Sequence, residues 1–335
     1  MKAISLFSGA GGMDIGFIKA GIKVIWAIDK DKDSVETYRK NIDDHIVCDD
    51  IHNLQIKAIP DADVIFGGPA CQGFSIAGKM NVNDPRNILI WNFFKIVKEK
   101  KPKVFIMENV KNLVKNRRFV QIKNSLISEY EKIGYDLIVK ILNSKNYGVP
   151  QSRERVIFIG INKNNSLRTF DFRSLFKQNK REISVKEALL NLYKKKVSLD
   201  GSIAKVVIAN RPVLRNTPYS GMILNGSGRP VDISKPSPTL TATMGGNRTP
   251  VIDGHYLLGK KKSDWFKYCH NSLKLGKKVT KVPSYIRRLT VAEVATLQTF
   301  PVSYKFSGST SSKYRQIGNA VPPLMAKEIA TCLMR

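Results

Sequence analysis

A cysteine, a glutamate, an asparagine and two arginines stand where they could perform nucleophilic chemistry together. Cys71 follows an apolar run within a Gly-Gly-Pro-Ala-Cys-Gln segment, so we expect it on a tight turn at the end of a strand, exposed as a nucleophile. Glu108 and Asn109 end the next apolar run, and Arg153 and Arg155 lead into a later one. A thiol, a carboxyl group and guanidinium groups at one sheet edge could attack a substrate and stabilise the charge that develops on it.

A second group of residues indicates a nucleotide-like ligand. The first apolar run ends in a glycine-rich turn, where the backbone can approach a ligand closely and direct amide groups at it. The spacing differs from the dinucleotide motif, because Gly9 and Gly11 match but Asp14 stands at the third glycine position. Asp29 closes the second run, where a carboxylate can accept from ribose hydroxyls, and Asp50 after the third suits an adenine edge.

The apolar pattern of the first half predicts the sheet that would bring these residues together. Helix-like stretches at 33–41, 88–100 and 119–133 alternate with short apolar runs, as in a parallel sheet. Ligands bind at the carboxyl ends of the strands in such sheets, where the candidate residues stand. We therefore predict an α/β domain with a parallel sheet. The predicted strands are residues 4–7, 24–28, 46–48, 64–66, 104–107, 137–142 and 156–159.

The second half follows a different pattern. From about residue 162 to 284 the alternation fades, basic and turn-forming residues increase, and no strong helical period is seen. This predicts a smaller, irregular domain. Regular signals return with Thr290 and Glu293, a capping box that opens a helix before Pro301, and with a final helix after residues 322–323.

Charge is the strongest compositional signal. The 335 residues include 56 Lys and Arg against 27 Asp and Glu, a net charge of +29, and residues 161–335 hold 31 basic and 9 acidic residues. Such an excess in a folded domain indicates a polyanionic partner. Nucleic acid fits better than a membrane surface, because no amphipathic basic helix is seen. Apolar residues make up 42% of the chain, enough for a sizeable core.

The expected compartment follows from what the sequence lacks. No apolar run approaches the ~18 residues of a membrane span, and the first residues lack the apolar core of a signal peptide. The four scattered cysteines, Cys48, Cys71, Cys269 and Cys332, are too few for a disulfide scaffold or a zinc pair. We expect a reducing, cytoplasmic location with no membrane partner.

Six segments, taken in order, resemble the DNA (cytosine-5)-methyltransferase family, most closely the small bacterial enzymes of restriction–modification systems. They are Phe-Ser-Gly-Ala-Gly-Gly at 7–12, Gly-Gly-Pro-Ala-Cys-Gln at 67–72, Glu-Asn-Val at 108–110, Gln-Ser-Arg-Glu-Arg at 151–155, Arg-Arg-Leu-Thr at 287–290 and Arg-Gln-Ile-Gly-Asn-Ala-Val-Pro at 315–322. Any one is a weak signal, but six in order are very specific. The resemblance implies the α/β fold of SAM-dependent methyltransferases, a Rossmann-like, mostly parallel sheet with helices on both faces. It also implies a catalytic domain at 1–161 and 285–335 and a smaller, irregular target-recognition domain at 162–284.

The resemblance also implies methylation of carbon 5 of a cytosine that is flipped out of duplex DNA. Cys71, as a thiolate, would add to carbon 6 and make carbon 5 nucleophilic. A protonated Glu108 would bond ring N3, placed by Asn109, and Arg155, together with Arg153, would hold the carbonyl oxygen. Loss of the carbon-5 proton would then expel the cysteine.

The implied cofactor is S-adenosylmethionine, with no metal. The implied partners are double-stranded DNA and a cognate restriction endonuclease that acts on the same site without contacting the chain, which we expect to be a monomer. The residues that match the family's cofactor pocket are Phe7, Gly9, Gly11, Asp29, Asp50, Ile51, Pro69, Leu89, Asn319 and Val321.

DNA contacts are expected from two regions. Residues 75–87 match the loop that closes on the flipped base in this family, with Ser75 and Lys79 as contacts, and Arg287 is a further candidate. Arg229 and Arg248 lie in glycine-rich, irregular chain of the recognition segment. Since arginine is the preferred reader of guanine edges, we expect these two to contact bases.

Three departures from the family pattern leave alternatives open. Ala70 precedes the cysteine where proline is usual, Asp29 stands where glutamate is usual, and Ala292 replaces the arginine of an arginine–glutamate pair. Ala70 loosens the turn without removing a reacting group, so a catalytically weakened DNA-binding relative is one alternative. An RNA methyltransferase on the same scaffold is another, although its Cys-Phe-Thr signature is absent here.

Overall fold

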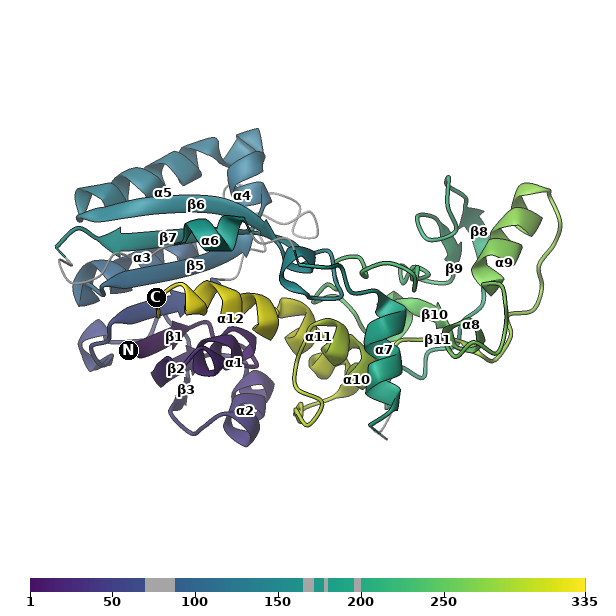
Figure 1. Cartoon of the computed structure of the whole chain (residues 1–335), viewed down its shortest axis with the longest axis horizontal. Coiled ribbons are helices and arrows are strands. Elements are labelled where there is room, and N and C mark those ends of the chain that lie inside the picture. Colours follow the sequence, from purple (N-terminus) through teal and green to yellow (C-terminus); the bar gives the residue numbers. More distant parts are fainter. Residues whose placement is uncertain (70–87, 165–171, 178–179, 196–199, 335) are drawn as a thin grey trace. The chain divides into compact units, whose positions relative to one another are not determined.

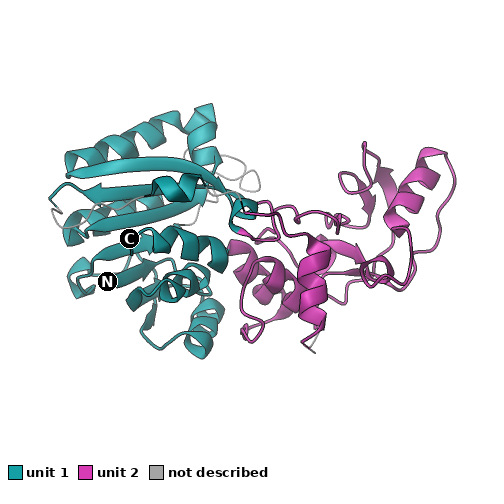
Figure 2. Ribbon diagram, in the orientation of Figure 1, with its two compact units in different colours: residues 1–147, 154–179, 320–335 teal, residues 148–153, 180–319 magenta. Residues whose placement is uncertain are grey.

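The chain forms two compact units, shown in separate colours in Figure 2. The computed structural model describes residues 1–69, 88–164, 172–177, 180–195 and 200–334. The first unit comprises residues 1–147, 154–179 and 320–335, and the second comprises residues 148–153 and 180–319.

A seven-stranded sheet forms the centre of the first unit (Figure 1), and all seven strands predicted from the sequence are present. The strand order is β3-β2-β1-β4-β5-β7-β6, and only β7 runs against its neighbours. The predicted mostly parallel α/β sheet is therefore confirmed. The strands are β1 (Lys2–Leu6), β2 (Lys23–Asp29), β3 (Ile46–Cys48), β4 (Val64–Gly67), β5 (Val104–Val110), β6 (Tyr135–Asn143) and β7 (Glu154–Asn162).

Helices cover both faces of this sheet. Successive strand residues point to opposite faces. In β4, Ile65 joins the cluster formed with α3 and α5, whereas the next residue, Phe66, stacks on Phe17 of α1 with 3.9 Å between ring centroids. The helices of this unit are α1 (Gly12–Lys19), α2 (Lys32–Asn41), α3 (Ile88–Lys100), α4 (Asn112–Lys115), α5 (Val120–Lys132), α6 (Arg173–Phe176) and α12 (Pro323–Thr331). Among the described helices of both units, none is long and apolar enough to cross a membrane.

The second unit contains short elements joined by long irregular connections. Two small antiparallel sheets pair β8 with β9 and β10 with β11. The predicted capping box is confirmed, because Thr290 and Glu293 exchange side-chain and backbone hydrogen bonds at the start of α10. The elements are α7 (Val185–Tyr193), β8 (Ile208–Val213), β9 (Met222–Leu224), β10 (Val251–Asp253), α8 (Gly254–Leu257), α9 (Trp265–Lys274), β11 (Ile286–Arg288), α10 (Val291–Leu297) and α11 (Thr310–Asn319).

Of the α-helices described in this unit, α10 was predicted, whereas α7, α8, α9 and α11 were not. The absence of a helical period suggested irregular chain, yet α7 and α9 are regular helices. Ser184 caps α7 by accepting from the backbone N–H of Glu187, and Asp264 caps α9 by accepting from that of Phe266. The Ser-x-x-Glu spacing at 184–187 was thus a readable signal for α7.

The units divide the chain differently from the predicted boundaries of 1–161, 162–284 and 285–335. Residues 285–319 belong to the second unit, because β11 pairs with β10 and α10 packs on α7. Residues 148–153 also belong there, whereas residues after 162 as far as 179 belong to the first unit. The Tyr147 hydroxyl donates to the carbonyl of Leu175 at 3.1 Å and ties that segment to the first unit.

Close packing of α1 against α12 requires a glycine. A Cβ on Gly16 would lie 2.5 Å from the Cβ of Ala326 and 2.5 Å from the backbone nitrogen of Lys327. Neither atom is the end of a flexible side chain, so the helices must separate to admit a larger residue.

We expect Gly16→Ala to lower the free energy of unfolding by about 1–3 kcal/mol, the usual cost of overpacking. Alanine gains up to about 1 kcal/mol of helix propensity, but this gain is smaller than the clash. Lys19→Ala, on an exposed site of the same helix, should stay within about 0.5 kcal/mol of wild type. Urea unfolding measures both, and an unchanged Gly16→Ala midpoint would show that α12 can move away freely.

Candidate functional site

Glu108 and Arg155 meet at the carboxyl edge of the sheet. Glu108 stands near the end of β5 and Arg155 near the start of β7, and the two strands pair antiparallel with Arg155 opposite Val110. The Nε of Arg155 lies 2.9 Å from Oε1 of Glu108, and both side chains are largely buried. Nη1 of Arg155 donates to the carbonyl of Glu154, and its Nη2 has no partner among the described residues. The site therefore presents a carboxyl group beside a guanidinium that keeps a donor available.

The segment that leads to Cys71 reaches this same edge. The side-chain amide of Asn109 donates to the carbonyl of Pro69 at 3.3 Å. A Cβ on Gly68 would lie 3.0 Å from Oε2 of Glu108, so glycine permits the close approach of this backbone to the carboxyl group. Cys71, Ser75 and Lys79 lie outside the described residues.

Arg153 lies in the second unit, within a hydrogen-bonded framework. Its side chain is 2% exposed, and its Nη1 donates to the carbonyls of Leu240 and Gly318 at 3.1 and 3.0 Å. Nearby, the side-chain oxygen of Gln151 accepts from the backbone N–H of Leu240 at 2.9 Å. In the Gln-x-Arg-x-Arg segment, Gln151 and Arg153 therefore join loops of the second unit. Arg155 lies in β7, within the sheet of the first unit.

The glycine-rich turn after β1 is held in shape by Asp29. Phe7, Gly9 and Gly11 all have positive φ, and the backbone N–H of Gly9 donates to Asp29 Oδ2 at 2.8 Å. The other oxygen of Asp29 accepts from the backbone N–H of Asp31 at 2.9 Å. Burial raises the pKa of Asp29, although the bonds from Asp31 and Gly9 lower it. Nothing lies within 4 Å of where a Gly9 Cβ would be, so the turn borders open space.

Apolar side chains and a second carboxylate surround this turn. Ile51 and Leu89 are buried in one hydrophobic cluster, and Phe7 packs against it. Asp50 pairs with Lys30 and accepts from the backbone and ring N–H of His52. Burial alone would raise the pKa of Asp50, but the bonds from His52 and Lys30 lower it to about 2. The carboxylate after β3 is therefore ionised at neutral pH.

The predicted cofactor residues lie mainly at the carboxyl ends of the first strands. Those from Phe7 to Leu89 belong to the first unit, as does the buried Val321 before α12. Asn319 is the last residue of α11 in the second unit.

In the second unit, Arg229 and Arg248 lie on neighbouring loops and both are exposed. The backbone N–H of Gly228 donates to the carbonyl of Asn247 at 3.1 Å, and that of Val251 donates to Arg229 at 3.0 Å. The two arginines therefore lie on two adjacent segments that are joined by backbone hydrogen bonds.

Arg288 connects these two loops through hydrogen bonds, a role that the sequence did not suggest. It is 3% exposed, and its guanidinium donates to carbonyls on both loops, those of Asn225, Asn247 and Thr249. Two further bonds reach the side-chain oxygens of Asn225 and Asn247. The only available signal was its place in the Arg-Arg-Leu-Thr segment.

The whole chain, residues 1–335, matches the family described as C-5 cytosine-specific DNA methylase. The chain belongs to this family. It is 33% identical over 338 residues to the Type II methyltransferase M.FnuDI of Fusobacterium nucleatum, covering 98% of this chain and 93% of that protein. The Type II methyltransferase M.NgoPII of Neisseria gonorrhoeae is 31% identical over 356 residues, covering 100% and 96%.

A solved structure supports the fold of this methylase. The S. pombe Dnmt2 methyltransferase superimposes with a TM-score of 0.70 at 19% identity, covering 100% of this chain and 98% of that one. The protein is thus a DNA cytosine-5 methyltransferase by family, similar to enzymes of Type II restriction–modification systems.

The methylase uses Arg287 in an internal ion pair. Its guanidinium binds Glu293 through two contacts of 2.8 and 2.7 Å, and its Nη2 also donates to the hydroxyl of Tyr193 at 2.9 Å. Burial opposes the charged form of Arg287, but its bonds with Glu293 raise the pKa above the ordinary value. This arginine links β11, α10 and α7, so we leave it out of the proposed DNA contacts.

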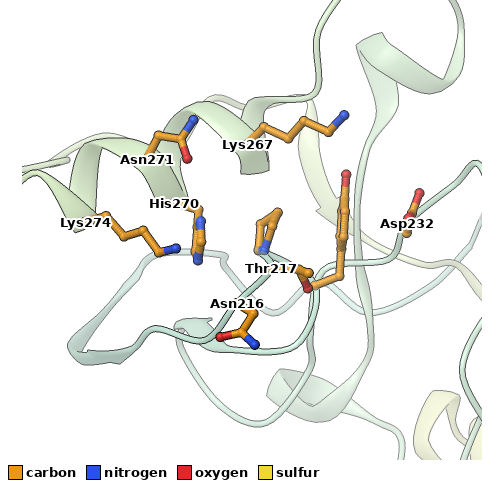
Figure 3. Close-up of a pocket in the computed structure, with 9 residues that line it drawn as sticks. Asn216, Thr217, Asp232, Lys267, His270, Asn271 and Lys274 are labelled. Atoms are coloured by element: carbon orange, nitrogen blue, oxygen red, sulfur yellow. The ribbon is translucent and has the colours of Figure 1, made fainter.

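A cavity of about 340 Å³ lies in the second unit of the methylase, between α9 and the chain at 216–219 (Figure 3). Lys267 and Lys274 of α9 line it, together with His270, whose Nε2 donates to the carbonyl of Arg215 at 2.7 Å. The positive charges of the two lysines favour binding of an anionic group in this cavity. Asp232 also lines the cavity, and its negative charge opposes such binding.

Asp14 generates a pH-dependent prediction. Its carboxyl group is fully buried in the first turn of α1, and the Tyr38 hydroxyl donates to it at 3.1 Å. Burial raises its pKa from 3.8 to about 7, despite the lowering effect of its hydrogen bonds. The folded chain therefore retains a proton that the unfolded chain loses above about pH 4.

We expect wild-type stability to fall as pH rises from about 4 to 7, by up to about 1.4 kcal/mol per pH unit from this group. Asp14→Asn should remove that component and be the more stable form at pH 8. Asp136→Asn, the same change on an exposed site, should keep the wild-type profile. Urea unfolding between pH 5 and 8 tests this, and parallel wild-type and Asp14→Asn profiles would refute it.

Proposed function

We propose that this methylase transfers a methyl group from S-adenosylmethionine to carbon 5 of a flipped-out cytosine in a short duplex DNA sequence. We further propose that it forms a covalent adduct through Cys71 and provides the protective half of a restriction–modification system, beside an endonuclease that cuts the same site. The observation that carries the proposal is the edge where Glu108 and Arg155 lie 2.9 Å apart, next to the Pro69 backbone that leads to Cys71.

The proposed chemistry begins with the thiolate of Cys71, which adds to carbon 6 of the cytosine and raises electron density at carbon 5. A protonated Glu108 donates to ring N3, and Nη2 of Arg155 donates to the carbonyl oxygen, so both stabilise the charge that develops on the ring. Asn109 holds the backbone of Pro69 beside the carboxyl group. After methylation, carbon 5 loses its proton and the electron pair expels the Cys71 thiolate, which restores the aromatic ring.

The residues at the first three strand ends fit the cofactor, which supplies an electrophilic methyl group when bound. Open space beside Gly9 allows a ligand to approach the backbone. The ionised Asp50 and the carboxylate of Asp29 can accept from hydroxyl or amino groups, and Phe7 with Leu89 offers an apolar surface. Asn319 and Val321 would complete this pocket.

Arg153 acts, in our proposal, on position rather than on the base. Its guanidinium is buried among carbonyls of its own unit, which leaves the cytosine oxygen to Arg155. The target base must leave the duplex stack to reach this edge, and we assign Ser75 and Lys79 to the loop that closes on it.

A single experiment separates the competing functions. The protein is incubated with S-adenosylmethionine labelled in its methyl group and with either duplex DNA or tRNA. Label in DNA alone supports the proposal, label in tRNA alone supports an RNA methyltransferase, and no label with DNA binding retained supports a catalytically weakened relative. Bisulfite sequencing of the methylated DNA then identifies the target site.

Cys71→Ser should abolish methyl transfer, because a hydroxyl group is a far weaker nucleophile than a thiolate. DNA binding should persist, since the charge and the second unit are unchanged. A duplex with 5-fluorocytosine at the target should trap wild type covalently, because fluorine cannot leave as a proton does. Cys48→Ser, on the exposed end of β3, is the matched control. Turnover in Cys71→Ser would exclude the assignment.

Arg229→Ala and Arg248→Ala should each cost about 1–3 kcal/mol of binding energy on the target site and almost nothing on random duplex. The exposed Arg211→Ala on β8 serves as a control of equal charge change. Affinities for both duplexes at one salt concentration provide the comparison. Equal weakening on all sequences would identify the two arginines as phosphate contacts and not as base readers.

A further inference from the structure

A basic corner of the first unit is not used by the proposed chemistry. It comprises Lys115 of α4, Arg117 and Arg118 of the short helix η4 (Arg117–Phe119), and Lys123 of α5; we call it the α4–α5 cluster. Lys115, Arg117 and Arg118 are exposed, and none has an acidic partner among the described residues.

The charge of this corner is unlike that of the chain around it. Residues 1–160 hold 25 basic and 18 acidic residues, an excess of seven. Residues 111–128 alone contribute five basic residues and no Asp or Glu, so they account for most of that excess. Elsewhere in the first unit lysines often face carboxylates, as Lys100 faces Asp61 at 3.1 Å and Lys103 faces Asp63 at 2.7 Å. Within residues 111–128, Lys111 pairs with Glu154, and the other four basic residues have no acidic partner among the described residues.

The backbone of the cluster is anchored. Leu113 and Phe119 are fully buried in the hydrophobic core that packs on the sheet. The side chain of Asn116 accepts from the backbone N–H of Arg118 at 3.0 Å. The chain from Lys115 to Arg118 is thus fixed between two core residues while its cationic side chains face outward. Held in this way, the backbone needs little ordering when a ligand binds.

The cluster begins at the active edge. β5 delivers Glu108 and Asn109 and ends at Val110, and α4 follows two residues later. α4 is a single turn, about 6 Å long, so Lys115 stays close to the end of β5. A duplex whose target base reaches Glu108 must bring its sugar–phosphate backbone to this edge of the sheet.

We infer that Lys115, Arg117 and Arg118 bind backbone phosphates of duplex DNA beside the target base, on a surface separate from the recognition loops of the second unit. The inference rests on the proposed function. The contacts are charge-assisted and carry no sequence information, so they position the duplex without selecting the site.

The test compares two triple variants of the full-length protein with the same loss of charge. The cluster variant combines Lys115→Gln, Arg117→Gln and Arg118→Gln, the three exposed cations of the α4–α5 cluster. The control combines Lys19→Gln, Lys98→Gln and Lys101→Gln, three exposed positions where α1 and α3 end at the opposite edge of the sheet. Binding to one random duplex and to the target duplex is measured from 50 to 200 mM salt.

Each phosphate contact contributes about 0.9 to the slope of log affinity against log salt. The slope for the cluster variant should therefore be shallower than that for wild type by about 2–3 on both duplexes. Across that fourfold salt range, the affinity of wild type should fall by a factor on the order of 40 times larger than the factor for the variant. The control should lose less than about 0.5. If the triple variant folds poorly, the single variants Arg117→Gln and Arg118→Gln replace it. Each should reduce the slope by about 0.9.

Phosphate ethylation interference locates the contacts. With the cluster variant, interference should disappear at phosphates next to the target cytosine and remain at those elsewhere. Equal slopes for the cluster and control variants, or an unchanged interference pattern, would overturn the inference while wild-type methylation stands. Failure of wild type to bind or methylate any duplex would instead remove the proposed function itself.

Discussion

The antiparallel pairing of β7 with β5 is the constraint on which the active edge depends. In a sheet of parallel strands, all carboxyl ends lie at one end of the sheet and all amino ends at the other. A residue at the start of a parallel strand would therefore lie far from the active edge. Because β7 is reversed, Arg155 at its beginning stands next to Glu108 at the end of β5, with Nε of Arg155 2.9 Å from Oε1 of Glu108. Phe158 and Ile159 in β7 are fully buried, so core packing fixes this register.

Buried arginines connect the irregular loops of the second unit, in addition to its apolar cluster around Trp265, Phe266 and Ile286. Arg153 and Arg288 are nearly inaccessible, and both donate to backbone carbonyls. A guanidinium has five donors in a fixed plane, so one side chain can satisfy carbonyls from several loops that lack sheet partners. Burial lowers the pKa of Arg288, which shows the cost of keeping its charge there. Irregular loops held in this way can carry exposed arginines at defined positions.

Much of the first unit, and the start of α10 in the second, was predictable because the signals are local. Seven apolar runs, the glycine turn at 7–12 and the capping box at Thr290 are short-range patterns, and each formed the expected element. The prediction of irregular chain was wrong at α7 and α9, where helices begin at capping residues Ser184 and Asp264. The buried residues of α7, Val185, Ala188, Leu189 and Leu192, follow the helical spacing, so this apolar period was present in the sequence and was missed. Tertiary packing of their buried faces stabilises such short helices.

The sequence by itself determined the family, the mostly parallel sheet and which residue types could perform the chemistry, because ordered motifs and strand patterns are properties of neighbouring residues. Only the tertiary structure decided how similar residues divide their roles. Arg153 and Arg155 are two positions apart, yet one binds carbonyls of the second unit and the other faces Glu108. Arg287 and Arg288 are adjacent, yet one pairs with Glu293 and the other joins two loops. Alternation along β11 sends the adjacent Arg287 and Arg288 to opposite faces. Arg153 lies before the first residue of β7, so strand alternation does not set its direction, and one of its partners, Gly318, is more than a hundred positions away in the sequence.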